Sequence, residues 1–171
     1  MLARYFTVRT TKAGGRVIIM KITPTENRGI DEDLFHTLCT LFEDIPIHKT
    51  LGMSLTYLGP GVAAMKMNVE PEYTTIKGRL HGGIIASLLD DVMGWSFNTL
   101  GRFGNVTVDM NLNFFSPVFQ GSEIIAEGTI VHAGRSIAVT EGSLWDNTGK
   151  LIAKSRGTFY VTKNADIIGA N

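Results

Sequence analysis

Several short segments of the chain alternate apolar and polar residues, and this period of two is typical of half-buried β-strands. The clearest case is residues 106–114, where five apolar residues at even positions, from Val106 to Phe114, alternate with polar ones. This pattern predicts a strand with one buried face. Similar strand patterns occupy residues 51–69, with a turn at 59–61, and then 123–131, 136–145 and 151–162. The later connections are short and polar, with a strong hairpin signal at 146–149, so we expect antiparallel neighbours.

Two other segments have the period of a helix. Residues 31–33 are acidic, which suits a helix start, and apolar residues from Leu34 to Ile45 recur at helical spacing until Pro46 interrupts them. This predicts an amphipathic helix of about four turns, with Cys39 packed rather than reactive. The second helix is expected at residues 82–101, where the only charged residues are Asp90 and Asp91.

The predicted helix at 82–101 has two different sides. Its apolar side is formed by Ile84, Ile85, Leu88, Leu89, Val92, Met93 and Trp95, and its small or polar side by Gly83, Ala86, Ser87, Asp90, Gly94 and Asn98. Asp90 lies in the middle of the second side, with Asp91 at its edge. A carboxylate in such a groove is partly desolvated, which raises its pKa and makes it a better base. The alternative is that both aspartates face water on an ordinary amphipathic helix.

The start of this helix carries two glycines, Gly82 and Gly83. Each weakens the first turn by roughly 1 kcal/mol relative to alanine, so their presence indicates that bare backbone is needed there. Backbone N–H groups at a helix N-terminus form a natural site for an anion or an oxyanion. The segment therefore combines a candidate base with a candidate oxyanion donor.

Composition narrows the class of protein. The 171 residues are 44% hydrophobic and 19% charged, which excludes a disordered or collagen-like chain. Lys plus Arg and Asp plus Glu both number 16, so we expect no nucleic-acid partner. No purely apolar run exceeds four residues, so we expect no membrane span. One cysteine permits no intrachain disulfide and suits the reducing cytoplasm.

The N-terminal region predicts a further element, and several motifs argue against other functions. Residues 1–25 contain no acid, and their β-prone runs 5–11 and 16–22 predict a hairpin extension, with a targeting segment as the alternative. The glycine pattern at 59–64 precedes a strand rather than a helix, which argues against dinucleotide binding. The sequence has no H-x-x-x-H, C-x-x-C or G-x-S-x-G pattern, so we expect neither a zinc site nor a serine hydrolase elbow.

His81-Gly82-Gly83 opens the second helix and Asp90 follows nine residues after the histidine. This arrangement, together with the segments 106–111, 115–117 and 149–153, resembles the phenylacetate-type (PaaI-like) hotdog acyl-CoA thioesterases of the hydroxybenzoyl-CoA thioesterase superfamily. The resemblance covers roughly residues 48–163. It implies an α+β hotdog fold, in which an antiparallel sheet wraps around a central helix. Residues 1–47 would then be an N-terminal extension, and residues 164–171 a C-terminal tail.

The resemblance also implies roles for individual residues. Asp90 would be the general base or nucleophile. The Gly82 N–H would polarise the thioester carbonyl, and Gly83 next to it would contact the substrate. Thr107 would help to place water, and His81 would shape the loop. The family often has Asn or Gln about six residues before the histidine, where this sequence has Thr75. The phosphates of CoA need cations, and Arg135, Lys154, Arg156 and Lys163 are candidates, although each also suits a solvated surface. CoA is part of the substrate, so we expect no metal and no redox cofactor.

The spacing of residues along the predicted helix indicates a second subunit. Gly83 and Asp90 are separated along one helix by about 10.5 Å of rise, too far for both to act on one thioester carbon. Two helices antiparallel across a twofold axis would bring them together, so we expect a homodimer or a dimer of dimers. A non-catalytic protein that binds acyl-CoA is the alternative function. A hydratase is disfavoured because no second acid–base residue is placed with a histidine.

Overall fold

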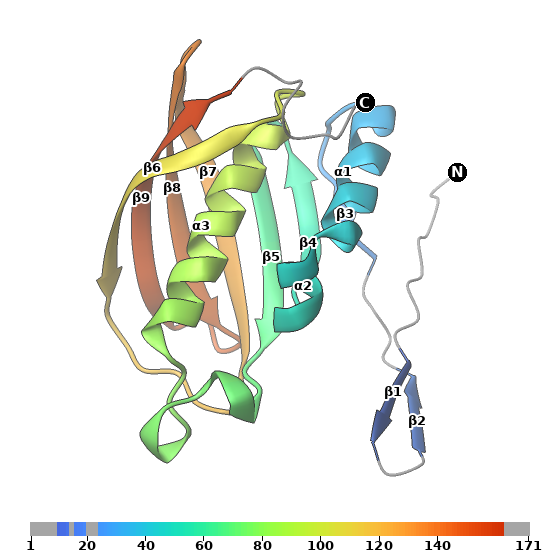
Figure 1. Ribbon diagram of the computed structural model, residues 1–171, viewed down its shortest axis with the longest axis vertical. Coiled ribbons are helices and arrows are strands. Elements are labelled where there is room, and N and C mark those ends of the chain that lie inside the picture. Colours follow the sequence, from blue (N-terminus) through green and yellow to red (C-terminus); the bar gives the residue numbers. More distant parts are fainter. Residues whose placement is uncertain (1–9, 14–15, 20–23, 163–171) are drawn as a thin grey trace.

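The computed structural model describes residues 10–13, 16–19 and 24–162. A curved sheet is formed by β3 (Glu26–Asn27), β4 (Ser54–Gly59), β5 (Val62–Asn68), β6 (Asn105–Phe114), β7 (Glu123–Ala133), β8 (Ile137–Asp146) and β9 (Leu151–Val161). The strand order is β3-β4-β5-β7-β8-β9-β6, and all neighbours are antiparallel except β3 and β4. The long helix α3 (Gly82–Asn98) lies along one face of this sheet (Figure 1). This arrangement confirms the predicted α+β hotdog fold.

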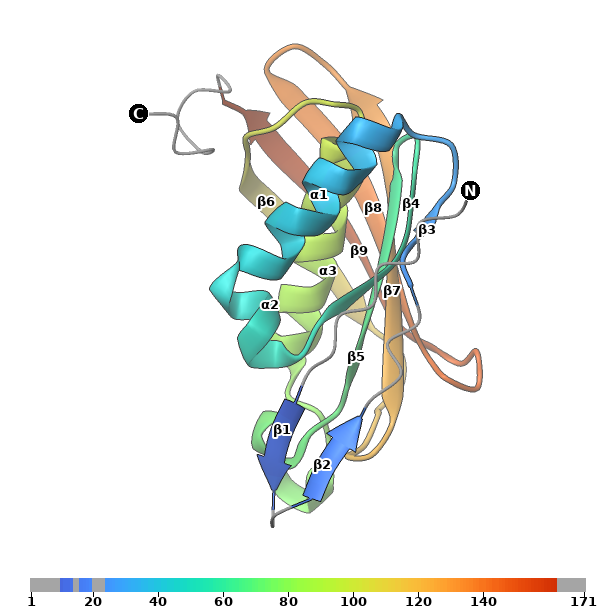
Figure 2. The same cartoon turned by 90° about the vertical axis from the view of Figure 1, so that its right-hand side faces the viewer.

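Two further α-helices precede the central one in sequence. The acidic segment starts α1 (Glu32–Asp44) as predicted, because the Asp31 carboxylate accepts a hydrogen bond from the Leu34 N–H. Pro46 ends the predicted apolar pattern but also begins a short helix that the sequence analysis missed, α2 (Pro46–Leu51). Proline suits the first turn of a helix because its missing N–H would have no partner there. Both helices lie beside α3 on the same side of the sheet (Figure 2).

The N-terminal region contains a separate hairpin. Strands β1 (Thr10–Ala13) and β2 (Arg16–Ile19) pair antiparallel, which confirms the predicted hairpin over these residues. The rest of the two β-prone runs, and the C-terminal tail at 164–171, lie outside the described residues. No helix in the described part of the chain is long and apolar enough to cross a membrane.

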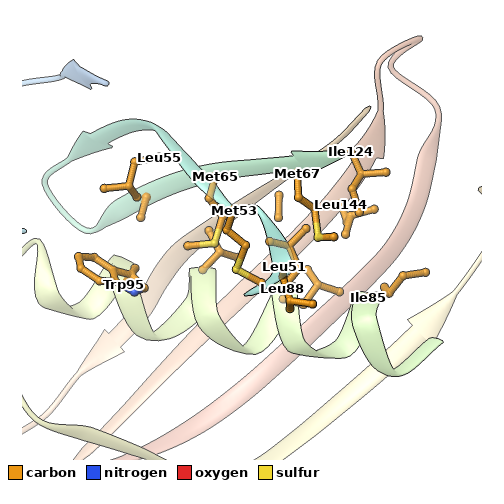
Figure 3. Close-up of a cluster of buried hydrophobic side chains, with 14 of the residues drawn as sticks. Leu51, Met53, Leu55, Met65, Met67, Ile85, Leu88, Trp95, Ile124 and Leu144 are labelled. Carbon is orange, nitrogen blue, oxygen red and sulfur yellow. The ribbon is translucent and has the colours of Figure 1, made fainter. Parts of the chain in front are cut away.

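The main hydrophobic core lies between α3 and the sheet. Figure 3 shows side chains from α2, α3, four strands and the segment between α2 and β4 pointing toward one another. The labelled ones are Leu51, Met53, Leu55, Met65, Met67, Ile85, Leu88, Trp95, Ile124 and Leu144, all buried. The apolar side of the predicted helix is therefore its core side. Cys39 packs against the same core, and burial raises the pKa of its thiol to about 11, as expected for a packed cysteine.

The central helix approaches the sheet closely because three strands carry glycine beneath it. A Cβ atom on Gly128 of β7 would lie only 2.3 Å from the carbonyl oxygen of Val92, so no larger residue fits without moving the helix backbone. Gly142, which pairs with Gly128 across β7 and β8, lies below Leu89 and Met93. At Gly128 the helix backbone therefore lies directly against the sheet backbone.

Strand β6 corrects one expectation. Its apolar residues do not share one buried face, because Val106 and Val108 are 51% and 62% exposed. Thr107 pairs with Phe159 and Asp109 with Thr158, so Val108 is an extra residue that forms a β-bulge. A bulge of one residue moves the following side chains to the other face. Thr107 before the bulge and Met110 and Leu112 after it consequently all face α3 and the core.

The glycines beneath α3 predict unequal costs for one added methyl group. Gly128→Ala should lower the free energy of unfolding by about 3 kcal/mol or more, because the new Cβ meets a helix carbonyl that cannot move alone. Gly142→Ala should cost about 1–2 kcal/mol, because the Leu89 and Met93 side chains that it meets can shift. Urea unfolding of both variants measures the difference. Equal costs would show that the backbone contact does not set the position of the helix.

Candidate active site

Asp90 and Thr107 meet beside the exposed part of α3. Asp90 lies near the middle of the helix and is half-buried. The Thr107 hydroxyl of β6 donates a hydrogen bond of 2.8 Å to one carboxylate oxygen of Asp90. The bulge at Val108 makes this contact possible, because it allows Thr107 to face the helix while Met110 also faces inward. The structure thus brings together the two polar residues that the resemblance implied as base and water-positioning group.

The surroundings of Asp90 change its acidity. Burial is the largest effect and raises the pKa of the carboxyl above its usual value, because the charged form loses hydration. The hydrogen bond from Thr107 lowers the pKa, and the nearby carboxylate of Asp91 raises it. The net direction is upward, which makes the ionised Asp90 a stronger proton acceptor than an exposed aspartate.

The loop before α3 is organised around His81. Its ring Nδ1 accepts the Gly83 N–H at 2.9 Å, so the histidine side chain caps the helix. This bond leaves Gly83 without a free N–H, and the Gly82 N–H, the first of the helix, has no acceptor within the helix. The ring of exposed Phe114 lies 3.3 Å from the place that a Gly82 side chain would occupy. The Gly82 backbone therefore packs next to an aromatic ring, with no side chain between them.

The regular helix separates the candidate base from the candidate donor. Asp90 follows Gly82 by eight residues in the uninterrupted helix α3, which corresponds to about 12 Å of rise. Within one chain, the Gly82 N–H and the Asp90 carboxylate cannot both contact one carbonyl group.

An open pocket of about 230 Å³ lies next to Asp90. Its lining residues are Asp90, Asp91, Gly94, Trp95, Asn98, Gly104, Asn105, Thr107 and Phe159. Asn105 fixes one wall, since its amide donates to the Asn98 side chain at 2.9 Å and to the Gly94 carbonyl at 3.3 Å. Asn105 was not predicted as a site residue, and its position two residues before Thr107 in the same strand was the only available signal.

Three other predicted residues lie away from this pocket. The Thr75 hydroxyl and N–H both bond to the Arg79 carbonyl, so the hydroxyl proton is already used within the loop. Arg156 is paired with Glu141 at 3.2 Å and alternates along β9 with residues that face α3, so it points to the opposite side of the sheet. Arg135 lies in the exposed turn between β7 and β8. In the described residues, no cluster of three or more His, Cys, Asp or Glu could hold a metal ion.

Comparison with known proteins agrees with this geometry. Residues 77–153 match the thioesterase superfamily. The chain is 35% identical over 116 residues to human acyl-coenzyme A thioesterase 13, an alignment that covers 66% of this chain and 83% of that protein. The chain belongs to the thioesterase superfamily. The predicted resemblance and the prediction of a thioester hydrolase are thus confirmed. The mouse acyl-coenzyme A thioesterase 13 is 34% identical over 111 residues and covers 64% of this thioesterase and 79% of its own length.

Solved structures show the same fold. The E. coli PaaI protein from the phenylacetic acid degradation operon superimposes with a TM-score of 0.75 at 20% identity, covering 80% of this chain and 98% of that one. A variant of PaaI from Thermus thermophilus gives a TM-score of 0.64 at 26% identity, covering 69% of this chain and 100% of that one. The PaaI-like hotdog architecture of this thioesterase is therefore confirmed.

The Thr107–Asp90 hydrogen bond predicts how Asp90 titrates. Thr107→Val should raise the pKa of Asp90 further, because the variant keeps the shape but loses the bond that favours the ionised form. A folded-state pKa above the unfolded value means that stability is lost as pH rises through the interval between the two. Because the variant widens the gap between the folded and unfolded pKa of Asp90, its free energy of unfolding should fall over a wider pH interval than in the wild type. NMR titration of the Asp90 carboxyl and urea unfolding at several pH values measure both effects.

Thr129→Val on β7 is the matched control. Residue 129 alternates with the residues of β7 that face α3, so its side chain points to the other face of the sheet, away from Asp90. An unchanged Asp90 titration in Thr107→Val would contradict the assigned hydrogen bond.

Proposed function

We propose that the protein hydrolyses acyl-CoA thioesters to a free acid and CoA, with Asp90 as general base or nucleophile. The supporting observation is a half-buried carboxylate of raised pKa, held by Thr107 at an open pocket in a member of the thioesterase superfamily. The relatives named acyl-coenzyme A thioesterase support CoA as the thiol part of the substrate.

The proposed reaction follows from the polar groups at the site. Asp90 removes a proton from a water molecule, and the water oxygen forms a bond to the thioester carbonyl carbon. The Thr107 hydroxyl holds the carboxylate in place and is close enough to orient the water. The Gly82 N–H stabilises the oxyanion that develops on the carbonyl oxygen. The C–S bond then breaks, and the proton held by Asp90 passes to the CoA thiolate, which returns the carboxylate to its starting state.

A second subunit is part of this proposal. The separation of Gly82 and Asp90 along α3 supports a donor from another chain. Strand β6 supports this, because it lies at the end of the sheet order and exposes Val106 and Val108. An apolar strand edge is a ready template for pairing with a second copy. We propose a homodimer or a dimer of dimers with sites formed between chains, in which Arg135 or Arg156 of either chain contacts the CoA phosphates outside the pocket.

A protein that binds acyl-CoA without hydrolysis is the second candidate. The observation that favours it is the hydrogen bond from the Thr75 hydroxyl to the Arg79 carbonyl, which uses the only side-chain proton that Thr75 could give to a substrate. Release of free thiol from a panel of acyl-CoAs distinguishes the two candidates. Binding without thiol release would support the second.

Loss of the Asp90 charge should abolish most turnover. Asp90→Asn keeps the shape of the side chain but cannot accept a proton, so kcat should fall by at least about 10²-fold. The same variant should be slightly more stable at neutral pH, because it removes a carboxylate that burial disfavours. Asp33→Asn at the exposed start of α1 is the matched control. A fully active Asp90→Asn enzyme would contradict the mechanism.

Subunit complementation tests the shared site. One parent is Asp90→Asn, and the other is Gly82→Pro, which removes the donor N–H at a first-turn position where proline suits a helix. Both parents should be nearly inactive and should be shown to fold. After mild unfolding and remixing, half of the dimers are mixed and each has one intact site, so about a quarter of all sites should recover. Activity that remains at the parental level, with mixed dimers confirmed by mass, would refute the shared site.

A further inference from the structure

Two side-chain amides, those of Asn98 at the end of α3 and Asn105 at the start of β6, form a pair in the wall of the pocket. The Asn105 amide nitrogen lies 3.3 Å from the Gly94 carbonyl oxygen and 2.9 Å from the Asn98 side-chain oxygen. Since a backbone carbonyl can only accept a hydrogen bond, this contact fixes which way the Asn105 amide points. Both hydrogens of that nitrogen are then used, and the atom of Asn98 that faces it must be its oxygen.

The amide pair leaves one donor group and one acceptor free. The donor is the side-chain NH2 of Asn98 and the acceptor is the side-chain oxygen of Asn105, and neither bonds to another residue in the described part of the chain. Both groups reach solvent, unlike the buried side-chain atoms that lack a partner elsewhere in the described residues. Gly94 suits this arrangement, because a Cβ there would lie only 3.0 Å from the Asn105 oxygen. The pocket wall therefore offers both kinds of polar contact to a ligand.

The two ends of the proposed reaction site differ in polarity. From Asp90 toward the C-terminal end of α3, the pocket wall passes Gly94 and reaches Asn98, about 12 Å of rise away. Beside the Gly82 N–H, the proposed oxyanion donor, the exposed ring of Phe114 supplies an apolar surface instead. A thioester has an acyl arm and a thiol arm, and in an acyl-CoA the thiol arm carries secondary amides, whereas a hydrocarbon acyl arm carries no further polar group. The polar end therefore suits the thiol arm.

We propose that Asn98 and Asn105 form a subsite for the thiol arm and bind its amide closest to sulfur. This inference rests on the proposed thioesterase function and deepens it. A secondary amide carries one N–H and one C=O, which match the acceptor of Asn105 and the donor of Asn98. In CoA, sulfur and two methylene groups separate this amide nitrogen from the thioester carbon, about 5 Å when extended. Gly94, beside the amide pair, lies about 6 Å of rise beyond Asp90, so the two lengths agree.

Two thioesters of the same acid test this subsite. The N-acetylcysteamine thioester keeps the amide, and the pentyl thioester has the same chain length without it. The wild type should hydrolyse the first with a kcat/KM at least about tenfold higher. Asn98→Asp keeps the acceptor for Asn105 but loses the free donor, and Asn98→Leu loses the donor without adding charge, so both should remove most of this preference. A change in folding or in the acidity of Asp90 affects both thioesters alike and leaves their ratio unchanged.

Asn147→Asp, in the exposed turn between β8 and β9, is the matched control and should keep the wild-type ratio. Equal kcat/KM values for the two thioesters in the wild type would overturn the proposal. So would Asn98 variants that slow both thioesters by the same factor. A third contrary result is a wild-type preference for hydroxylated acyl groups that Asn98→Leu removes while the preference for the thiol persists. That result would place the acyl arm, and not the thiol arm, at the amide pair.

Binding gives a readout that is independent of hydrolysis. In nitrogen NMR of the wild-type protein, the side-chain NH2 signals of Asn98 should shift when pantetheine, the uncharged thiol arm of CoA, is added, and pentanethiol should leave them in place. Signals that pantetheine does not move would overturn the proposal even where neither Asn98 variant folds. If the wild type releases no thiol from any thioester but these signals shift, the proposed function fails and the subsite stands. If thiol is released and the signals do not shift, the subsite fails and the proposed function stands.

Discussion

The contact between the α3 backbone and the glycines of the sheet is the constraint on which the rest of the structure depends. Because Gly128 has no side chain, the carbonyl of Val92 can approach β7 closely, and the helix settles deep in the curve of the sheet. Asp90 lies two residues from Val92, about 200° around the helix, so it faces away from this contact and toward Thr107 of β6. The same contact therefore fixes both the core and the position of the helix that carries Asp90.

Local sequence patterns were sufficient for most of the fold. The acidic start of α1 and the period of α3 identified both long helices, because capping and amphipathic packing act over a few residues. Asp90 was predicted as the candidate base for the same reason, since its place among small residues is a property of one helix. Short antiparallel connections located the strands from β7 to β9. These features depend on neighbours in the chain, and a single sequence displays them directly.

Features that depend on distant residues were not visible in the same way. The bulge at Val108 is a mismatch between β6 and β9, and the alternation of β6 alone predicted the wrong face for Val106 and Val108. The contact between His48 and Asp91 joins residues 43 positions apart through the packing of α2 on α3. Helix α2 was missed because Pro46 both ends one pattern and begins another. In each case the decisive information lies in how two elements meet.

The pairing of β6 with β9 also has a consequence for the order in which the protein forms during synthesis. Among the described strands, β6 pairs only with β9, the last strand of the sheet in the chain. Asp90 and Thr107 are close in sequence, yet β6 is fixed in place only when β9 has left the ribosome and closed a long loop. A nascent chain that ends before Leu151 can form the helix and most of the sheet without a completed site. The candidate site is thus completed at the end of folding, after the packing on which it depends.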